Sequence, residues 1–323
     1  MAYMPEQSQD QDPGFGENYA RRTKRIINKD GSFNVVRKGA GYSVRDAYLF
    51  LINISWFKFL LLLLLVYALV NLGFTGLYYW IGIAHLKGVE EGTKIHQFLN
   101  AYFFSVQTFT TVGYGVISPQ GLPANIIASL EAMSGWLFFA LVSGLLFGRF
   151  SKPTTRILFS RSAIITPAQP FPQLMFRIVN KRNNLLMELE AKVLLMVVNE
   201  SNNEHNRQYF GLKLAIPNLN FFTLPWTIVH EINESSPLYG KTPAHLENTD
   251  AEILILIKGF DDTFSQEVHA RYSYRFEEIV WGATFLPAYD IDNKGEIIMD
   301  VKQLHKYDLT PLPEEALRRQ EEG

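Results

Sequence analysis

Two stretches of this chain are apolar over lengths that suit a membrane-spanning helix. Leu60 to Tyr79 is almost charge-free, and a helix needs roughly 20 apolar residues to cross a bilayer. Ala124 to Phe150 is also largely apolar, and its only charged residues are Glu131 and Arg149. At ~1.5 Å per residue this second helix would be about 40 Å long. It is therefore expected to cross with a tilt and to extend beyond the lipid.

A short amphipathic helix is predicted just before the first span. Ser43 is a candidate N-cap. Apolar residues follow at helical spacing, namely Val44, Ala47, Tyr48, Leu51 and Ile52. This helix is expected to lie along the inner membrane interface, with Trp56 and Lys58 as anchors. Periodicity alone leaves open the alternative that these residues extend the span itself.

A third apolar segment lies between the two spans. Ile95 to Thr108 is apolar and aromatic, but ~14 residues are too few to cross a bilayer. We expect a re-entrant half-helix. Non-helical backbone at membrane depth is tolerated only where protein surrounds it or where it lines water. The residues after Thr108 are therefore expected to line a pore.

After Pro153 the pattern becomes that of a soluble β domain. Ala191 to Val198, Thr227 to Ile232 and Glu252 to Lys258 are strand-like, with Gly, Pro and Asn between them. About 150 residues of this kind suit a β-sandwich. The expected fold is a membrane α-helical pore domain, with two spans and a re-entrant pore helix, joined to an all-β domain.

These patterns divide the chain into five segments. They are an N-terminal segment (1–42), an interfacial slide helix (43–56), a transmembrane pore domain (57–152), a β-sandwich (153–310) and a C-terminal tail (311–323). The first residues, to about Asn18, lack an apolar period and are predicted to be disordered. The charged C-terminal tail is expected to fray.

Cationic residues flank both spans on one side. They are Arg21, Arg22, Lys24, Arg25, Lys29, Arg37, Lys38 and Arg45 before the first span, and Arg149, Lys152 and Arg156 at the end of the second. The positive-inside rule then predicts a multi-pass protein of the cell membrane with both termini cytoplasmic. The polar start, Met1 to Gly16, gives no secretory signal.

Composition narrows the function classes. The net charge of -2 argues against nucleic acid as a partner. The chain has no cysteine, which excludes disulfides, thiolate metal sites and a cysteine nucleophile.

The motif that carries chemistry directly follows the half-helix. Potassium filters line a pore with carbonyl oxygens of such a motif, here Thr111, Val112, Gly113, Tyr114 and Gly115. A dehydrated K⁺ needs about eight oxygens, which four copies of one strand supply if successive carbonyls face the axis. That geometry requires unusual backbone angles, which glycine adopts without a Cβ penalty. We expect K⁺ to bind along Thr111, Val112, Gly113 and Tyr114, and expect no organic cofactor.

Two further features of this region agree with a cation pore. The half-helix directs its C-terminal end at the cavity, where the ~0.5 negative charge of the macrodipole favours a cation. Thr111 adds a hydroxyl at the inner end. The side chains of Val112 and Tyr114 are expected to point away from the ions and to pack behind the strand.

Four other stretches resemble the inward-rectifier potassium channel family, most closely its bacterial members. They are Thr227 to Tyr239, Asn28 to Gly31, Arg149 to Pro153 and Glu278 to Gly282. The resemblance covers roughly residues 25 to 310. It implies a homotetramer in which an immunoglobulin-like cytoplasmic domain extends the pore. It also implies passive K⁺ permeation regulated by lipid or ligand, and no enzymatic activity.

The chain departs from the family pattern around the filter. Many members pair a glutamate in the half-helix with an arginine just past the filter. This chain has Gln107, and no arginine between Val116 and Gly121. Filter support is therefore expected to rely on other contacts. The cysteine pair that brackets the filter in eukaryotic members is absent, which favours a bacterial relative.

The resemblance also implies a gate in the second span. Phe147 matches the position where an aromatic residue closes the inner helix bundle, and four such side chains would form a dewetting constriction. Contact with lipid is the alternative for Phe147. Gly135 and Gly144 could act as hinges, or could permit close helix packing, the more common use of small residues in membrane helices.

A lipid-regulatory site is expected at the inner leaflet, where each cation near anionic lipid contributes ~1 kcal/mol. The residues are Lys58, Arg149, Lys152 and Arg156. Anionic lipid or phosphoinositide is the expected partner. The alternative is that these cations serve topology alone.

Rectification is expected to be weak. Strong rectifiers hold Mg²⁺ or polyamines with acidic side chains, and the resemblance puts Phe139 at the inner-helix position of one such acid. It puts Lys258, beside Gly259 and Phe260, at a second, in the cytoplasmic pore. An attractive ring would there become a repulsive one, so Mg²⁺ and polyamines are expected to be weak blockers.

Glu131 is an ionisable residue in an apolar helix, and such residues are functional candidates. Hydrogen bonding to the back of the half-helix and a role in the ion pathway remain alternatives. His230 and Glu231 are adjacent in a predicted strand and would face opposite sides, which predicts a structural role.

The rival function is a membrane-anchored receptor whose spans merely tether a binding domain. A tether has no use for the Thr111 to Gly115 motif, which favours the channel. A channel of a different regulatory family is a third alternative, and the His230 to Tyr239 stretch argues against it.

Overall fold

The computed structural model describes residues 12–16, 18–19, 25–36, 38–39, 44–89, 92–152, 156–201 and 204–312. The chain divides into two compact units. Lys38–Lys152 forms a helical unit, called here the membrane unit, and Met1–Arg37 joins Pro153–Gly323 in the β unit. Several residues of the sequence predictions lie outside the described ones, namely Ser43, Arg21, Arg22, Lys24, Arg37, Pro153, the first 11 residues of the expected N-terminal tail and residues 313–323 of the C-terminal tail.

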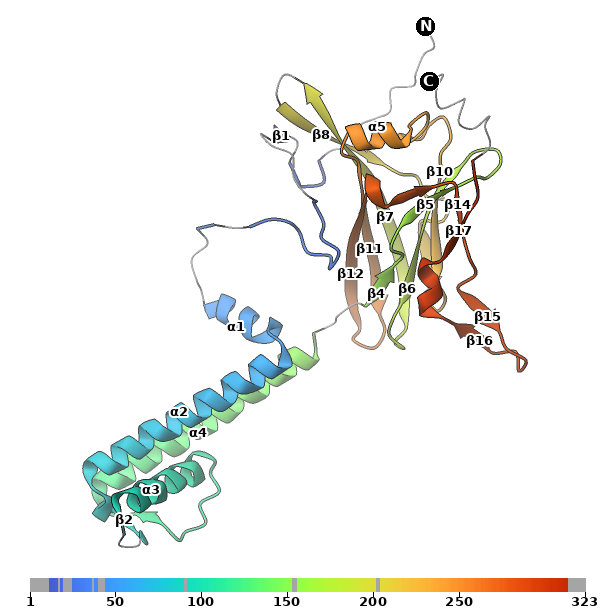
Figure 1. Ribbon diagram of the computed structural model, residues 1–323. Coiled ribbons are helices and arrows are strands. Elements are labelled where there is room, and N and C mark those ends of the chain that lie inside the picture. Colours follow the sequence, from blue (N-terminus) through green and yellow to red (C-terminus); the bar gives the residue numbers. More distant parts are fainter. Residues whose placement is uncertain are drawn as a thin grey trace. The chain divides into compact units, whose positions relative to one another are not determined.

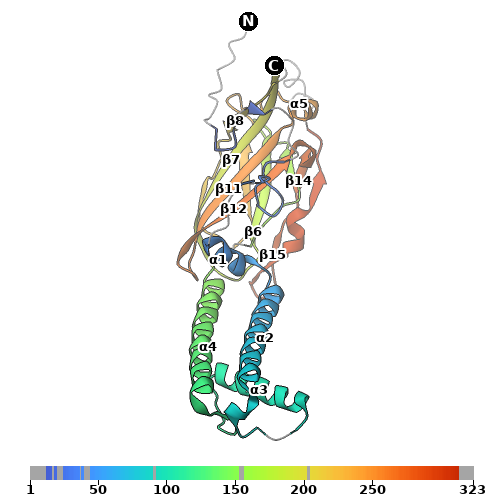
Figure 2. The same cartoon turned by 90° about the vertical axis from the view of Figure 1, so that its left-hand side faces the viewer.

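Among its described residues, the membrane unit has four helices and a small two-stranded sheet. The helices are α1 (Val44–Asn53), α2 (Trp56–Ile81), α3 (Lys94–Phe109) and α4 (Gly121–Phe150). A short 3-10 turn, η1 (Ile83–His85), and the paired strands β2 (Leu86–Lys87) and β3 (Ser118–Pro119) connect them. The helices α2 and α4 run side by side, with α1 near one end of the pair and α3 near the other (Figures 1 and 2).

Both long helices have the composition and exposure of membrane spans. Among the described residues, α2 and α4 are long and apolar enough to cross a bilayer, and only 11% of the apolar stretch in each is buried inside the unit. Their leucine and aromatic side chains therefore face outward, which is favourable in lipid and unfavourable in water. Both spans and the half-helix are confirmed, with ends that differ by a few residues from those predicted.

The short first helix is separate from the first span. Ile54 and Ser55 interrupt the helical backbone between α1 and α2. Ser55 has an extended conformation with φ -60° and ψ 151°, and α2 begins at Trp56. The alternative in which α1 merely extends the span is therefore wrong.

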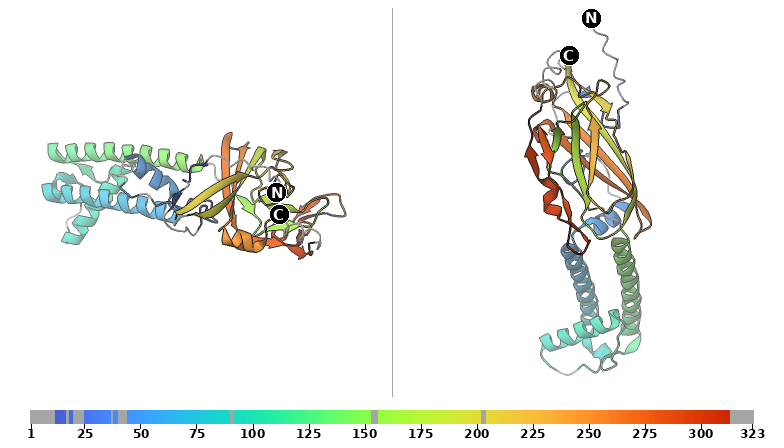
Figure 3. Two further views of the ribbon diagram at one scale, coloured as in Figure 1. Left: turned by 90° about the horizontal axis from the view of Figure 1, so that it is seen from above. Right: turned by 90° about the vertical axis from the view of Figure 1, so that its right-hand side faces the viewer.

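The β unit contains two main sheets, seen from two sides in Figures 1 and 3. Among described residues, one sheet has the order β1-β8-β7-β11-β12 with β9 beside β7. Its strands are β1 (Asn18–Tyr19), β7 (Leu186–Ser201), β8 (Glu204–Gly211), β9 (Asn218–Phe221), β11 (Glu252–Asp261) and β12 (Gln266–Arg275). The N-terminal segment thus contributes an edge strand.

The second sheet has the order β10-β6-β5-β13 with β4 beside β6. Its strands are β4 (Ile157–Phe159), β5 (Ala163–Thr166), β6 (Gln173–Asn180), β10 (Trp226–Glu231) and β13 (Ile279–Trp281). All pairs in the two sheets are antiparallel except β5 with β13. The remaining elements are α5 (Pro243–Asn248), η2 (Phe276–Glu278), η3 (Val301–His305), β14 (Ala283–Phe285) with β17 (Tyr307–Leu309), and β15 (Tyr289–Ile291) with β16 (Ile297–Met299).

The core of the β unit lies between these two sheets. One continuous apolar cluster takes Leu189 and Ile255 from the first sheet and Phe176 and Ile228 from the second. The alternation of buried and half-buried residues along β10 places every second side chain in this core. The β-sandwich is confirmed. The three strands predicted from sequence correspond to β7, β10 and β11, with Ile232 one residue beyond the end of β10.

His230 has the structural role predicted for it. Its ring is buried, and its two nitrogens lie 2.7 Å from the Lys213 carbonyl oxygen and 2.7 Å from Ser236 Oγ. Burial lowers the pKa of His230 below its ordinary value, which favours the neutral ring.

Candidate functional site

The strand after α3 alternates between left-handed and ordinary backbone conformations. Thr111, Gly113 and Gly115 have φ of 60°, 52° and 82°, whereas Val112 and Tyr114 between them do not have positive φ. In an ordinary strand, successive carbonyls point to opposite sides, and this alternation turns them toward one side. The glycine conformations agree with the sequence prediction. The left-handed Thr111 was missed, because threonine is strongly disfavoured there and its residue type gives no signal.

The main chain at the end of α3 fastens the start of this strand. The Gln107 carbonyl oxygen accepts from the Val112 N–H at 2.9 Å and from the Gly113 N–H at 3.3 Å. The Thr111 N–H donates to the Thr108 carbonyl oxygen at 3.0 Å. The helix terminus and the strand are thereby one hydrogen-bonded unit. Gln107 contributes through its backbone, where the family pattern uses a glutamate side chain.

A cavity of about 420 Å³ adjoins the inner end of the strand. Thr111 and Phe139 both line it, together with Gly135. The side chains of Val112 and Tyr114 are 53% and 75% exposed on the single subunit, so the expectation that they pack behind the strand stays a prediction. Phe139 and Phe147 are 71% and 75% exposed, and the gate role of Phe147 likewise stays a prediction.

Gly135 makes a close backbone contact with the pore helix. A Cβ placed on Gly135 would lie 1.9 Å from the Phe109 carbonyl oxygen, which is far too short for any side chain. A Cβ on Gly144 would meet nothing within 4 Å. At Gly135 the contact favours the packing alternative over the hinge.

Glu131 lies at the back of the pore helix. It is fully buried, and its carboxyl group is hydrogen-bonded to Tyr78 of α2 at 2.6 Å and to Ser105 of α3. Of the two alternatives left open by the sequence, the structure supports hydrogen bonding to the half-helix.

Arg149, near the end of α4, binds the end of α1. Its guanidinium donates to the carbonyl oxygens of Ile52 at 3.1 Å and Ile54 at 2.7 Å, and also to that of Leu51. It also stacks over the rings of Trp56 and Phe59, at 4.5 and 4.4 Å from their centroids. These carbonyls have no partner within the helix, so Arg149 acts as a C-terminal cap.

The side chains of the other three cations expected to bind lipid are more exposed than that of Arg149. Lys58 and Arg156 are exposed. Lys152 is exposed and is hydrogen-bonded to Asn53. The four cations grouped together by the sequence therefore have different surroundings, and Arg149 is the one whose two terminal nitrogens bind main-chain carbonyl oxygens.

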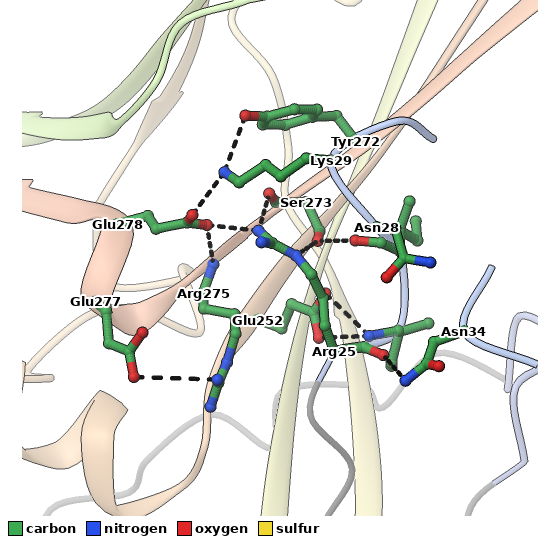
Figure 4. Close-up of polar contacts among 12 residues, drawn as sticks. Arg25, Asn28, Lys29, Asn34, Glu252, Tyr272, Ser273, Arg275, Glu277 and Glu278 are labelled. Carbon is green, nitrogen blue, oxygen red and sulfur yellow. Dashed lines mark hydrogen bonds and ion pairs between the residues drawn. The ribbon is translucent and has the colours of Figure 1, made fainter. Parts of the chain in front are cut away.

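An ionic cluster joins the N-terminal segment to the β-sandwich (Figure 4). Glu278 accepts from Arg25 at 2.5 Å and from Lys29 at 2.6 Å. The Ile26 N–H donates to the buried Glu252 at 3.1 Å. Burial raises the pKa of Glu278, but hydrogen bonds from Lys29, the Arg275 N–H and Arg25 outweigh it, and the pKa lies below its ordinary value. No local pattern predicts these contacts, since about 250 residues separate the partners.

Lys258, which the resemblance places in the cytoplasmic pore, is paired with a carboxylate. Lys258 Nζ lies 2.8 Å from the Glu267 carboxylate, and the hydrogen bond with Glu267 raises the pKa of Lys258. Glu188 and Glu190 line the same cavity, of about 280 Å³, with Gly259 and Phe260. Three carboxylates and one ammonium group therefore line this cavity, and Glu190 is also paired with Lys192 at 3.3 Å. Gly259 coincides with a shift of register between β11 and β7.

Comparison with known proteins identifies both parts of the chain. Residues 157–323 match the sequence model of the inward rectifier potassium channel C-terminal domain, and residues 59–152 match the model described as ion channel. The inward rectifier potassium channel Kirbac3.1 of Paramagnetospirillum magnetotacticum is 35% identical over 290 residues, covering 88% of this chain and 96% of that protein.

Eukaryotic channels are also similar. The G protein-activated inward rectifier potassium channel 2 of Rattus norvegicus is 28% identical over an alignment of 339 residues, covering 96% of this chain and 78% of that protein. The G protein-activated inward rectifier potassium channel 4 of Mus musculus is 28% identical over 308 residues, covering 87% and 72%.

Proposed function

This chain belongs to the inward rectifier potassium channel family, and from that premise we propose that Thr111–Gly115 is the selectivity filter through which K⁺ passes passively. The protein is a potassium channel of the inward-rectifier type and not an enzyme. Channels of this family are tetramers regulated by lipids. We extend this to a homotetramer in the cell membrane with both termini in the cytoplasm.

The observation that carries the proposal is the alternating backbone of the filter strand. Left-handed residues at Thr111, Gly113 and Gly115 allow carbonyls to face one axis, and four copies would supply the ~8 oxygens that replace the hydration shell of K⁺. The C-terminal end of α3 meets this strand at Gln107. K⁺ would bind along Thr111, Val112, Gly113 and Tyr114, with no organic cofactor.

The test replaces Gly113 with alanine. An L-residue held at φ 52° is strained by ~1–2 kcal/mol, so the carbonyl of the substituted residue should leave the axis. The Gly113→Ala channel should then lose its preference for Rb⁺ over Na⁺ in liposome flux assays. Gly82→Ala is a matched control, because Gly82 also has positive φ (99°) and open space for a Cβ but lies outside the filter. Equal loss of selectivity in both variants would contradict the assignment.

We propose a gate and lipid contacts from the positions that correspond to those of the family. Four Phe147 side chains would close the inner end of the pore, and Phe139 would line its cavity. Anionic lipid or phosphoinositide would bind Lys58, Lys152 and Arg156, whose side chains are exposed. Arg149 belongs to the same proposed lipid site, and its contacts with α1 support a structural role in addition.

We propose weak rectification. Phe139 offers no charge to Mg²⁺ or a polyamine in the membrane cavity. In the cavity around Lys258, with Gly259 and Phe260, the ammonium is offset by Glu267, so this site would attract cations weakly rather than repel them.

A further inference from the structure

A cluster of buried polar side chains lies inside the membrane unit, behind the pore helix. Its members are fully buried and come from three helices: Asn71, Thr75 and Tyr78 from α2, Ser105 from α3 and Glu131 from α4. The three α2 residues are spaced three and four apart, so they share one face of that helix. Polar groups at membrane depth are costly to bury, and each one must be satisfied from within the protein.

The number of hydrogens available to this cluster indicates the protonation state of Glu131. Tyr78 Oη lies 2.6 Å from Glu131 Oε2, and Ser105 Oγ is hydrogen-bonded to Glu131 Oε1. Ser105 Oγ also lies 3.2 Å from the side-chain oxygen of Asn71 and 3.1 Å from its main-chain oxygen, and the latter already accepts from Thr75 Oγ1 at 2.7 Å. The Asn71 Nδ2 donates to the Tyr67 carbonyl at 2.7 Å, so this amide cannot be reversed without bringing two oxygens together.

If Glu131 were ionised, two hydroxyl hydrogens would have to serve three acceptors. Tyr78 and Ser105 would donate to the carboxylate, and the buried Asn71 side-chain oxygen would receive no hydrogen. One more proton completes the network. A neutral Glu131 donates through Oε1 to Ser105, Ser105 donates to Asn71, and Tyr78 donates to Glu131 Oε2. Every oxygen then has a partner.

The surroundings also favour the neutral acid. Ala101 and Phe104 of the pore helix belong to an apolar cluster around Tyr78, with Ile127 and Ala128 of α4 packed against it. Each ion pair found between described residues lies outside the membrane unit. A lone carboxylate in such surroundings costs several kcal/mol, and protonation removes this cost. Tyr78 is the titratable group that faces Glu131, and its hydroxyl is a donor.

The same cluster fixes the position of the pore helix. Ser105 and Phe109 are one turn apart on α3, and they meet Glu131 and Gly135, one turn apart on α4. Two contacts at successive turns set both the height and the rotation of the helix. Ser105 precedes Gln107 by two residues, and the Gln107 carbonyl holds the amides of the filter.

We propose that Glu131 is a neutral carboxylic acid which positions the pore helix, and through it the filter, in a channel that lacks the side-chain support expected beside Gln107. Glu131 is a positioning residue, since it touches neither the filter strand nor the ions. The role in selectivity rests on the proposed filter, whereas the protonation state does not.

Infrared difference spectroscopy of the full-length channel in liposomes tests the protonation state. At neutral pH, the spectrum of the unmodified protein minus that of Glu131→Gln should contain the carbonyl stretch of a protonated carboxylic acid, shifted on exchange into D₂O. Other acids cancel in the difference. A carboxylate stretch in its place would overturn the proposal, and this readout is independent of the filter assignment.

Selectivity tests the positioning role. Glutamine retains both a donor and an acceptor, so Glu131→Gln should keep the ratio of Rb⁺ to Na⁺ flux within about twofold, a change of under ~0.5 kcal/mol. Glu131→Met keeps the length but loses both hydrogen bonds and should lower the ratio about tenfold or more. Ser105→Ala is a milder variant in case Glu131→Met does not assemble, and it should lower the ratio in the same direction.

Ser134→Ala is the matched control on the same helix. Its hydroxyl donates to the Leu130 carbonyl at 2.7 Å, within α4 itself, and the flux ratio should not change. Unchanged selectivity in both Glu131→Met and Ser105→Ala would overturn the positioning role. Should Gly113→Ala keep its selectivity while the infrared band is present, the filter assignment would fail and the neutral acid would remain.

Discussion

In the β unit, ion pairs join distant segments: Arg25 and Lys29 bind Glu278 at 2.5 and 2.6 Å, and Arg275 binds Asp250 at 2.6 Å. The membrane unit contains no ion pair between its described residues. Its buried polar groups are joined by hydrogen bonds, and Arg149 binds carbonyl oxygens and aromatic rings.

The difference follows from the two solvents. A surface ion pair in water needs little desolvation and is weak, and salt screens it. In hydrocarbon a charge costs several kcal/mol, so neutral hydrogen bonds and close packing replace it. The stability of the β unit should therefore depend on salt and pH. The stability of the membrane unit should depend on the size and hydrogen-bonding capacity of its buried side chains.

The largest effect is expected for Gly135→Val. The obstacle is the backbone of Phe109, with its carbonyl oxygen 1.9 Å from the position of a Cβ, and a backbone cannot move aside as a flexible side chain can. The pore helix should be displaced, with loss of K⁺ flux and of tetramer stability on heating. Gly144→Val on the same helix, where a Cβ meets nothing within 4 Å, should be tolerated. Equal tolerance of both would contradict the packing role.

A charge introduced into the membrane cavity should have the next largest effect. We expect weak block of the unmodified channel by internal spermine, and a large gain in affinity for Phe139→Asp. One contact between unit charges at ~4 Å contributes ~1 to 4 kcal/mol, depending on the effective dielectric, which corresponds to about a fivefold to a thousandfold change. Patch recordings from reconstituted channels measure this. Tight voltage-dependent block of the unmodified protein would show that the role given to Phe139 is wrong.

Removal of the Arg149 cap should have a smaller effect. Arg149→Met keeps much of the apolar contact with Trp56 but leaves carbonyls of α1 without a donor. A hydrogen bond to a charged group contributes ~1.5–3 kcal/mol to stability, and this contribution would be lost. Lower thermal stability of the tetramer should follow, with partial recovery in Arg149→Lys, which has the charge but not the fork.

A contrasting double variant separates this role from lipid binding. Neutralising Lys152 and Arg156 together should change how flux depends on the fraction of anionic lipid, with little loss of stability. A variant of Arg149 that altered only the lipid dependence, with unchanged stability, would remove the distinction between these cations.

The smallest effect is expected in the β unit, at Glu278. Its pKa in the folded chain lies below the ordinary value of 4.5, so its ionised form stabilises the fold. This contribution is complete above about pH 4.5 and is lost as the pH falls through the lower folded-state value. Thermal unfolding followed from pH 7 down to about pH 3 should show a shallower acid-induced loss of stability for Glu278→Gln. High salt should reduce the difference from the unmodified protein.

Sequence patterns predicted the elements whose signals are local. The two spans and the half-helix each depend on a run of neighbouring residues, and all three lie where they were expected. Strands β7, β10 and β11 were likewise predicted, from their strand-like composition and from the Gly, Pro and Asn residues between them.

What the sequence could not predict depends on partners distant along the chain. Glu278 meets Arg25 across about 250 residues. The pairing of Lys258 with Glu267 is closer in sequence but depends on how two strands align, and one aligned position cannot show the carboxylate beside it. The role of Gly135 likewise required the position of Phe109.

The central claim is that Thr111–Gly115 makes this chain a K⁺-selective channel, and ion flux into liposomes that hold only the purified protein tests it most directly. In liposomes loaded with K⁺, the outward K⁺ gradient should drive accumulation of external Rb⁺. Added external K⁺ should reduce this uptake, and added external Na⁺ should not. The Gly113→Ala protein should lose this discrimination while Gly82→Ala keeps it. Flux that does not distinguish Rb⁺ from Na⁺, from tetramers of normal stability, would contradict the account.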